Sequence, residues 1–189
     1  MLRLLTVALC LVANFGMAQD ISSETELRNA VGRLDIGETG FCTGALVSDD
    51  VVLTAAHCLF NKETGDRFGL ADMAFRPGLT NGESAATRGV QAVFIHPSYH
   101  SAKKGDLQNL PFDLALLKLS RPLQHGASIA IDVGYPNLGG APASVLSYGK
   151  GRSDTAMMQR DCLLSPQFGN RRIKNHGIRF IGIVNRVEF

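Results

Sequence analysis

The sequence predicts an all-β protein, built from short strands that turns interrupt. The 189 residues include 20 glycines and 7 prolines, which favour turns and break regular elements. Apolar positions cluster in short runs between these turn residues, as strands of an all-β protein require. A content of 45% hydrophobic and 19% charged residues is typical of globular proteins and excludes disordered or collagen-like chains. We therefore expect short strands and no long helical bundle.

The first 18 residues have the order of a secretory signal peptide. Arg3 supplies an early positive charge, the stretch from Leu4 to Val12 is apolar, and Gly16-Met17-Ala18 places small residues at the end. The apolar stretch is too short for a permanent membrane span. We predict cleavage after Ala18 and a secreted protein, extracellular or periplasmic, without a membrane anchor.

Secretion changes how the four cysteines are interpreted, because an oxidising compartment favours disulfides. Removing the leader removes Cys10 and leaves Cys42, Cys58 and Cys162. Three is an odd number, so at least one thiol of the mature chain has no partner within it.

The first set of strands is expected within residues 19–121. Residues 19–29 are a polar lead-in, residues 75–84 are too rich in Pro, Gly and Asn to be one regular element, and residues 98–111 form a long polar connection. The predicted strands are Ala30–Ile36, Thr43–Val47, Val51–Thr54, Val90–Ile95 and Leu114–Leu119, the last of which is mostly apolar and expected to be mostly buried.

A second, shorter set of β elements is expected after Pro122, at Ile129–Ile131, Ser144–Tyr148 and Cys162–Leu164. From Asn170 the chain becomes basic: residues 170–189 hold five Lys and Arg against one Glu, whereas residues 1–169 carry a net charge of −2. The overall charge of +2 is small and comes from this tail alone, so it gives no reason to expect nucleic acid as a partner. The predicted organisation is a signal peptide (1–18), a first β unit with its lead-in (19–121), a second partial unit (122–169) and an aberrant basic tail (170–189).

Four sequence motifs, taken together and in their order along the chain, indicate a protein family. The first is Thr54-Ala55-Ala56-His57-Cys58, with Cys42 sixteen residues before Cys58. His96-Pro97-Ser98-Tyr99 comes next, and Phe112-Asp113-Leu114-Ala115-Leu116-Leu117-Lys118-Leu119 is followed by Arg121-Pro122-Leu123. Together they resemble the trypsin-like serine proteases. The resemblance implies a double β-barrel, here with a complete first barrel and an incomplete second one. It also implies a serine endopeptidase that acts on polypeptides by acyl transfer and needs no cofactor.

The resemblance also assigns roles. A serine hydroxyl is a poor nucleophile at neutral pH and needs a base, which the resemblance places at His57, while Asp113 would orient the imidazole. Cys42 and Cys58 would form a disulfide. Cys162 would then be unpaired, since related proteases pair a cysteine near this point with one just before the nucleophile.

The family's nucleophile is missing from the sequence. No serine after Asp113 lies in a Gly-x-Ser-x-Gly context; the six are Ser120, Ser128, Ser144, Ser147, Ser153 and Ser165. Only 76 residues follow Asp113, fewer than the family uses, which suggests a chain truncated before its nucleophile, with a frameshift as the hypothesis for the tail. We therefore expect this chain to be an inactive homologue. The alternative is a non-catalytic binding module that uses the first barrel and the tail.

A metal site is not expected. His96 and His100 have a spacing that suits metal ligands on a helix, but Pro97 lies between them, and solvated loop histidines are the simpler interpretation. His125 and His176 lack a partner signal. The sequence does not predict an oligomeric state.

Overall fold

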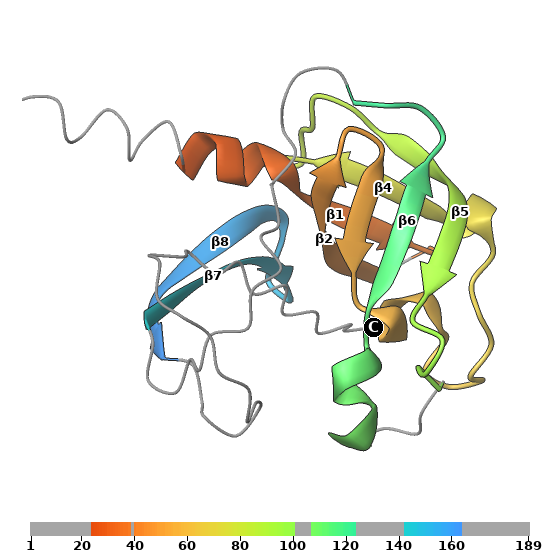
Figure 1. Ribbon diagram of the computed structural model, residues 1–189. Helices are drawn as coiled ribbons and strands as arrows, with labels where there is room; N and C mark the ends of the chain where they lie inside the picture. The colour runs from red at the N-terminus through yellow and green to blue at the C-terminus, as the bar shows by residue number, and fades with distance from the viewer. Residues whose placement is uncertain (1–23, 39, 101–106, 124–141, 164–189) are drawn as a thin grey trace, which may run out of the picture.

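The computed structural model describes residues 24–38, 40–100, 107–123 and 142–163 (Figure 1). Its strands are β1 (Val31–Ile36), β2 (Gly40–Ser48), β3 (Val51–Thr54), β4 (Met73–Pro77), β5 (Arg88–Ile95), β6 (Ala115–Leu119), β7 (Pro142–Gly149) and β8 (Arg152–Leu163). Three short 3₁₀ helices lie between strands: η1 (Ala56–Leu59), η2 (Leu70–Asp72) and η3 (Leu107–Phe112). No helix among the described residues is both long and apolar enough to cross a bilayer.

The first six strands form a closed antiparallel barrel in the order β1-β2-β3-β6-β5-β4, and the pairing of β4 with β1 closes it. The closure leaves none of these strands as an open edge. Strand β4 shows the alternation that a barrel requires, because Met73, Phe75 and Pro77 are buried while Ala74 and Arg76 are half-buried. The barrel thus has a continuous apolar interior.

Phe75 fills that interior at a point where two glycines make room. Gly32 and Gly44 face each other across β1 and β2, and a Cβ on Gly32 would lie 2.4 Å from Phe75 Cζ. A Cβ on Gly44 would lie 2.6 Å from Val52 Cγ1 and 3.2 Å from Phe75 Cε2. Both glycines are therefore required by packing density around a fully buried ring.

Strands β7 and β8 form a two-stranded sheet that packs against the barrel. Buried Tyr148 makes the link: its backbone N–H donates to Thr43 Oγ1 (3.0 Å), and its hydroxyl donates to the Leu79 carbonyl (3.0 Å). Leu146 and Ala156 join these residues in a second apolar cluster between hairpin and barrel. The predicted all-β class is confirmed, with a closed six-stranded barrel and, in the described part of the chain, a second, partial sheet.

Some local predictions differ from the structure. Residues 24–30 form a helix where a loose polar lead-in was expected. Strand β4 lies within and before the turn-rich stretch, and β8 runs continuously through the segment where only a loop and a final short strand were expected. Cys162 is in β8. The leader, the predicted strand Ile129–Ile131 and the basic tail lie outside the described residues.

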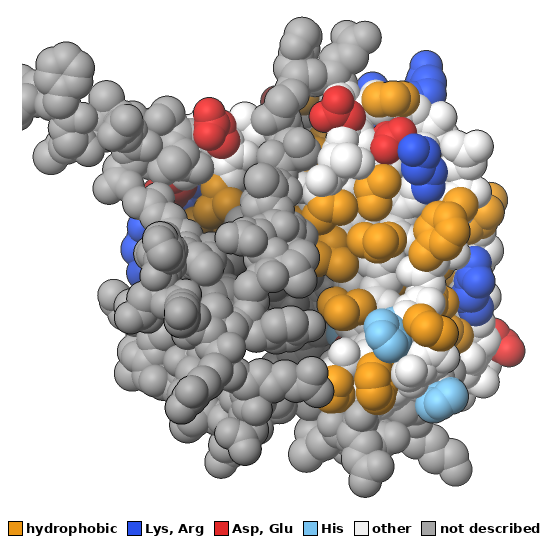
Figure 2. All heavy atoms as spheres, viewed as in Figure 1, with side chains coloured by type: hydrophobic (Ala, Val, Ile, Leu, Met, Phe, Trp, Pro, Cys, Tyr) orange, Lys and Arg blue, Asp and Glu red, His pale blue; other side chains and the backbone are white. Residues whose placement is uncertain are grey.

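Strand β6 is buried on one face only, although its apolar sequence predicts a mostly buried strand. Its residues alternate, with Leu117 and Leu119 inside the barrel and Leu116 40% exposed. Figure 2 shows apolar side chains gathered on the barrel face over β5 and β6. The exposed members are Leu116, its cross-strand partner Phe94 and the neighbouring Leu114. The barrel therefore presents an apolar patch, made of these three residues, on its outer surface.

Candidate active site

The pairing of β3 with β6 brings His57 and Asp113 together from distant parts of the sequence. The two strands are antiparallel, and Thr54, the last residue of β3, pairs with Ala115, the first of β6. His57 follows in η1, directly after β3, and Asp113 precedes β6. Because both residues lie just beyond the same end of one ladder, the register brings them close to each other.

Two hydrogen bonds join the residues. Asp113 Oδ2 lies 2.6 Å from His57 Nδ1, and Asp113 Oδ1 accepts the backbone N–H of His57 at 2.8 Å. An ionised carboxylate has no proton to donate, so the ring must donate through Nδ1–H, which leaves Nε2 as an acceptor. The structure thus holds the imidazole in the tautomer and orientation that a general base requires.

Electrostatics favour the ionised form of Asp113. Burial by itself would raise the pKa of its carboxyl, but the hydrogen bonds from the His57 ring and from the backbone N–H groups of His57 and Ala56 outweigh burial and lower the pKa below its usual value. The side chain of Asp113 is 16% exposed and that of His57 is 30% exposed. The carboxylate is therefore largely shielded while the imidazole keeps access to solvent.

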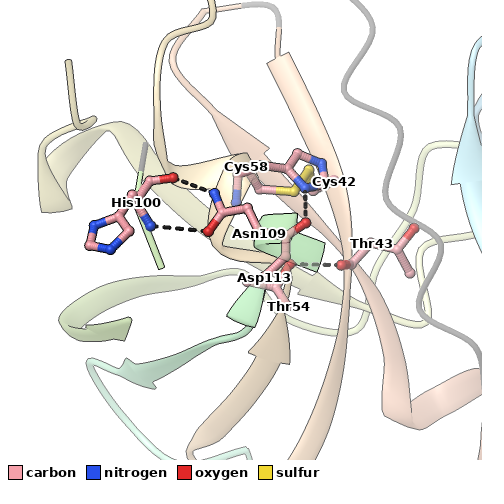
Figure 3. Close-up of polar contacts among 8 residues, drawn as sticks. Cys42, Thr43, Thr54, Cys58, His100, Asn109 and Asp113 are labelled. Atoms are coloured by element: carbon pink, nitrogen blue, oxygen red, sulfur yellow. Dashed lines mark hydrogen bonds and ion pairs between the residues drawn. A yellow bond between two sulfur atoms is a disulfide. The ribbon is translucent and has the colours of Figure 1, made fainter. Parts of the chain in front are cut away.

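A disulfide and a buried hydroxyl fix the segment that carries His57 (Figure 3). Cys58 is bonded to Cys42 on β2, with a Cα–Cα distance of 6.4 Å, and both residues are buried. Thr54, at the end of β3, donates its hydroxyl to the Thr43 carbonyl at 3.0 Å. The structure thus contains the Cys42–Cys58 disulfide implied by the sequence resemblance.

The chain that leads to Asp113 is fixed by Asn109, a residue that the sequence did not indicate. Asn109 in η3 is buried; its Oδ1 accepts the N–H of His100 at 3.2 Å, and its Nδ2 donates to the carbonyl of the same residue (Figure 3). The Tyr99 ring contacts that of Phe60, which follows η1, in a tilted arrangement with ring centroids 5.8 Å apart. Burial and the charge of Asp113 raise the pKa of Tyr99 to about 12. An asparagine in a polar stretch carries no sequence signal for such a role.

The other histidines and the metal-ligand cluster have simple structural explanations. His96 Nδ1 accepts the N–H of Ser98 at 3.1 Å, a local turn contact. Cys42, His57 and Cys58 place three potential ligand atoms within 4.8 Å of one another, but the two sulfurs are bonded to each other and are not thiolates. His125 and His176 lie outside the described residues.

A nucleophile is not found beside His57 in the described part of the chain. The described serines after Asp113 are Ser120, Ser144, Ser147 and Ser153, and none of them hydrogen-bonds to His57. Ser128 and Ser165 lie outside the described residues. In the part of the chain that the structure describes, the site therefore consists of the His57 imidazole and the Asp113 carboxylate bonded to it.

Two solved structures resemble this one in fold. The inactivated protease paralogue S-D1 of the scabies mite matches with a TM-score of 0.53 and 15% identity, over 69% of this chain and 55% of its own. A Glu endopeptidase, solved in complex with MPD, matches with a TM-score of 0.58 and 16% identity, over 72% of this chain and 64% of its own. The chain thus spans 55% and 64% of the lengths of these proteins, and the likeness fits the trypsin-like double-barrel fold.

The sequence comparison agrees with the geometry. The residues around His57 and Asp113 fall within the matched region, and so do both sheets. The family model described as Trypsin matches residues 21–182, most of the chain, and the chain therefore belongs to the trypsin family.

Proposed function

We propose that this chain is a secreted homologue of trypsin-like serine endopeptidases in which His57 is the general base and Asp113 its orienting residue. The observation that carries the proposal is the bond of 2.6 Å between His57 Nδ1 and Asp113 Oδ2, with the second carboxylate oxygen held by the His57 backbone. Two bonds to one carboxylate fix both the position and the tautomer of the ring. A carboxylate that only capped the turn would bond to the His57 backbone N–H and would not need the second bond to the imidazole ring.

The chemistry that such a pair serves is acyl transfer to a serine. His57 Nε2 would take the hydroxyl proton as the oxygen attacks the peptide carbonyl, and the imidazolium would later give that proton to the leaving amine. The negative charge of Asp113 would stabilise the imidazolium, and its lowered pKa keeps it ionised at neutral pH. Polypeptides would be the substrates.

We further propose that the 189-residue polypeptide does not catalyse this reaction by itself. Its sequence offers no serine in the glycine-rich context from which the family draws both nucleophile and oxyanion-hole amides. Loss of the nucleophile in serine proteases lowers kcat on the order of a million-fold. An oriented base without a nucleophile has nothing to deprotonate.

One experiment tests the activity state. The oxidised chain is incubated with a fluorophosphonate probe and with a chromogenic peptide substrate, and an active trypsin serves as the positive control. We expect neither covalent labelling nor hydrolysis. Labelling of any serine would contradict the proposal, and peptide mapping would then identify the nucleophile.

A second experiment tests the pair without requiring activity. Proton NMR should show the His57 Nδ1–H resonance strongly downfield-shifted in the folded protein, and Asp113→Ala should abolish that signal. His96→Gln is the matched control, because His96 Nδ1 accepts a backbone N–H and carries no proton. Persistence of the resonance in the Asp113 variant would refute the assigned partnership.

A non-catalytic binding module is the second candidate, and the apolar patch of Phe94, Leu114 and Leu116 favours it. Phe94 is 64% exposed and Leu114 is 48% exposed, although Leu114 directly follows Asp113. Contiguous apolar surface of this kind is typical of protein interaction sites. In a binding assay with an unfolded polypeptide, Phe94→Ser should weaken retention if the patch serves this role. Unchanged retention would exclude the patch.

Secretion is proposed from the leader and is consistent with the disulfide. Disulfides such as Cys42–Cys58 persist in oxidising compartments. Mass spectrometry of the exported protein should find Gln19 at the amino terminus. Alkylation of the denatured but unreduced protein should then modify one cysteine, Cys162. Two or more modified cysteines, or a retained leader, would contradict this part of the proposal.

A further inference from the structure

The end of the barrel opposite His57 contains a cavity of about 650 Å³. Asp113 precedes β6 and Arg121 follows it, so strand β6 separates the two regions. The cavity is bounded by Leu46 on β2, Pro77 at the end of β4 and Arg88 at the start of β5, together with the chain that follows β6. Its volume is within the range of about 300–1,000 Å³ that small-molecule sites occupy.

The charge of the cavity is positive. Arg88 and Arg121 both line it, and the described lining residues include no carboxylate. Two acidic residues lie next to this end of β6: Asp50 is already paired with Lys118 at 2.5 Å, and Asp49 is exposed and does not line the cavity. Two guanidinium groups without an acidic counterpart in the described lining favour an anionic ligand.

Arg88 also has an unused donor. Its Nη1 donates to the Thr87 carbonyl at 3.1 Å, but its Nε is buried and has no hydrogen-bond partner among the described residues. A buried N–H on a charged group is costly to leave unsatisfied, so its presence calls for an acceptor. Because Nε is inaccessible to solvent in the structure, a ligand in the cavity reaches it only when the Arg88 side chain turns toward the cavity, and Nε and a terminal nitrogen then form the fork that binds the two oxygens of a carboxylate.

The remaining walls are apolar. Leu46, Pro77, Ala85, Ala86, Pro122 and Leu123 contribute carbon surface around the two guanidinium groups. A small inorganic anion would leave this surface in contact with water. A ligand with a hydrocarbon body would cover it and gain hydrophobic free energy in addition to the ion pair.

We propose that this cavity binds a small organic carboxylate with an apolar body. The Arg88 side chain turns so that its unused Nε pairs with the carboxylate, Arg121 adds a second positive charge, and the body packs on the apolar walls. The site is independent of His57 and Asp113, because it lies at the other end of the barrel.

Isothermal titration calorimetry and two-dimensional NMR of the full, oxidised chain test the proposal with matched probes. N-acetyl-leucine carries the carboxylate and the apolar body, N-acetyl-leucinamide keeps the body without the charge, and inorganic phosphate keeps a charge without the body. We expect saturable binding of N-acetyl-leucine that is about tenfold or more tighter than that of either analogue. Equal binding of the amide or of phosphate would overturn the proposal, and so would the absence of binding.

Two variants locate the site. Arg88→Gln and Arg121→Gln should each weaken binding of N-acetyl-leucine, with the larger loss, about tenfold or more, for Arg88. Arg67→Gln is the matched control, because Arg67 is an exposed arginine that does not line the cavity, and it should change affinity by less than about twofold. A loss shared equally by all three variants would indicate a general charge effect and overturn the assignment. The comparison of probes on the unmodified chain holds even if a variant fails to fold.

Discussion

Breaking the Cys42–Cys58 disulfide should lower stability by an amount that the structure allows us to calculate. The bridge closes a loop of 16 residues. In the chain-entropy treatment, releasing a loop of this length gives the unfolded chain about 10 cal/mol/K of additional entropy, or about 3 kcal/mol at 25 °C. Against a typical free energy of unfolding of about 5–15 kcal/mol, this is a large fraction.

The assay separates the constraint from the packing. Urea unfolding is followed by circular dichroism for the oxidised protein, for the same protein reduced, and for Cys42→Ala/Cys58→Ala, all in a Cys162→Ser background that prevents thiol exchange. Reduction keeps both sulfur atoms in place and should cost about 3 kcal/mol. The double alanine variant should cost more, because both side chains are 1–2% exposed and their removal leaves a small cavity.

The same reduction should leave the His57–Asp113 pair intact while the protein stays folded. Segment η1 has a second anchor, the bond of 2.8 Å from the His57 backbone N–H to Asp113 Oδ1. The downfield Nδ1–H resonance should therefore persist in the reduced, folded protein. Its loss without denaturant would refute the view that η1 is doubly anchored, and a stability change below about 1 kcal/mol would refute the entropic calculation.

Three further changes test other parts of the structure. Folding lowers the pKa of Asp113 from its ordinary 3.8, so the ionised carboxylate stabilises the folded state above that value, and this stabilisation is lost as the pH falls through the lowered pKa. In urea unfolding at a series of pH values, the free energy of unfolding should therefore decline less steeply below about pH 4 in Asp113→Asn than in the unmodified protein. Gly44→Ala should destabilise by about 1–3 kcal/mol, and Val52→Ala should recover part of that loss in a double-mutant cycle, because the clash is with Val52 Cγ1; purely additive losses would contradict the packing argument. Tyr148→Phe should cost about 1–3 kcal/mol in urea unfolding, since it leaves the buried Leu79 carbonyl without its donor, and spectrophotometric titration of the native protein should find the pKa of Tyr148, which burial raises, at about 12.

The parts of the fold that the sequence predicted are those with strong local signals. Strand Val51–Thr54 was predicted with its observed bounds, because an apolar run between a turn and the His57 motif leaves little freedom. Strand β8 was not predicted as a whole, since Ala156 is its one buried residue among those whose side chains are described, and a half-exposed hairpin strand gives no clear alternation. Strand β4 could have been found in the sequence, because Met73, Phe75 and Pro77 alternate there with the small Ala74 and the charged Arg76.

Long-range contacts explain the rest of the differences. The helix at residues 24–30 is polar and short. Its i,i+4 pair of Glu24 and Arg28, 2.9 Å apart, is a weak local signal, and two long-range bonds also hold the helix: Arg160 pairs with Glu24 at 2.6 Å, and Arg28 donates to the Ala156 carbonyl at 3.2 Å. Asn109 likewise acts on a backbone nine residues away. Tertiary context therefore overrides local propensity at these positions.

Among the described residues, the contacts that fix the His57–Asp113 geometry come from the first barrel. Its determinants are the β3–β6 register and the two bonds to Asp113, with the Cys42–Cys58 disulfide as a further anchor of η1, and all of these lie within one closed sheet and the segments next to it. A change elsewhere in the chain that removes the nucleophile would leave this arrangement folded and oriented. An oriented imidazole–carboxylate pair in a trypsin-family barrel is therefore no measure of activity, and the fold is shared both by a Glu endopeptidase and by an inactivated protease paralogue. An active member is distinguished by a serine whose hydroxyl group donates a hydrogen bond to Nε2. The fluorophosphonate probe labels such a serine directly and is therefore the decisive measurement.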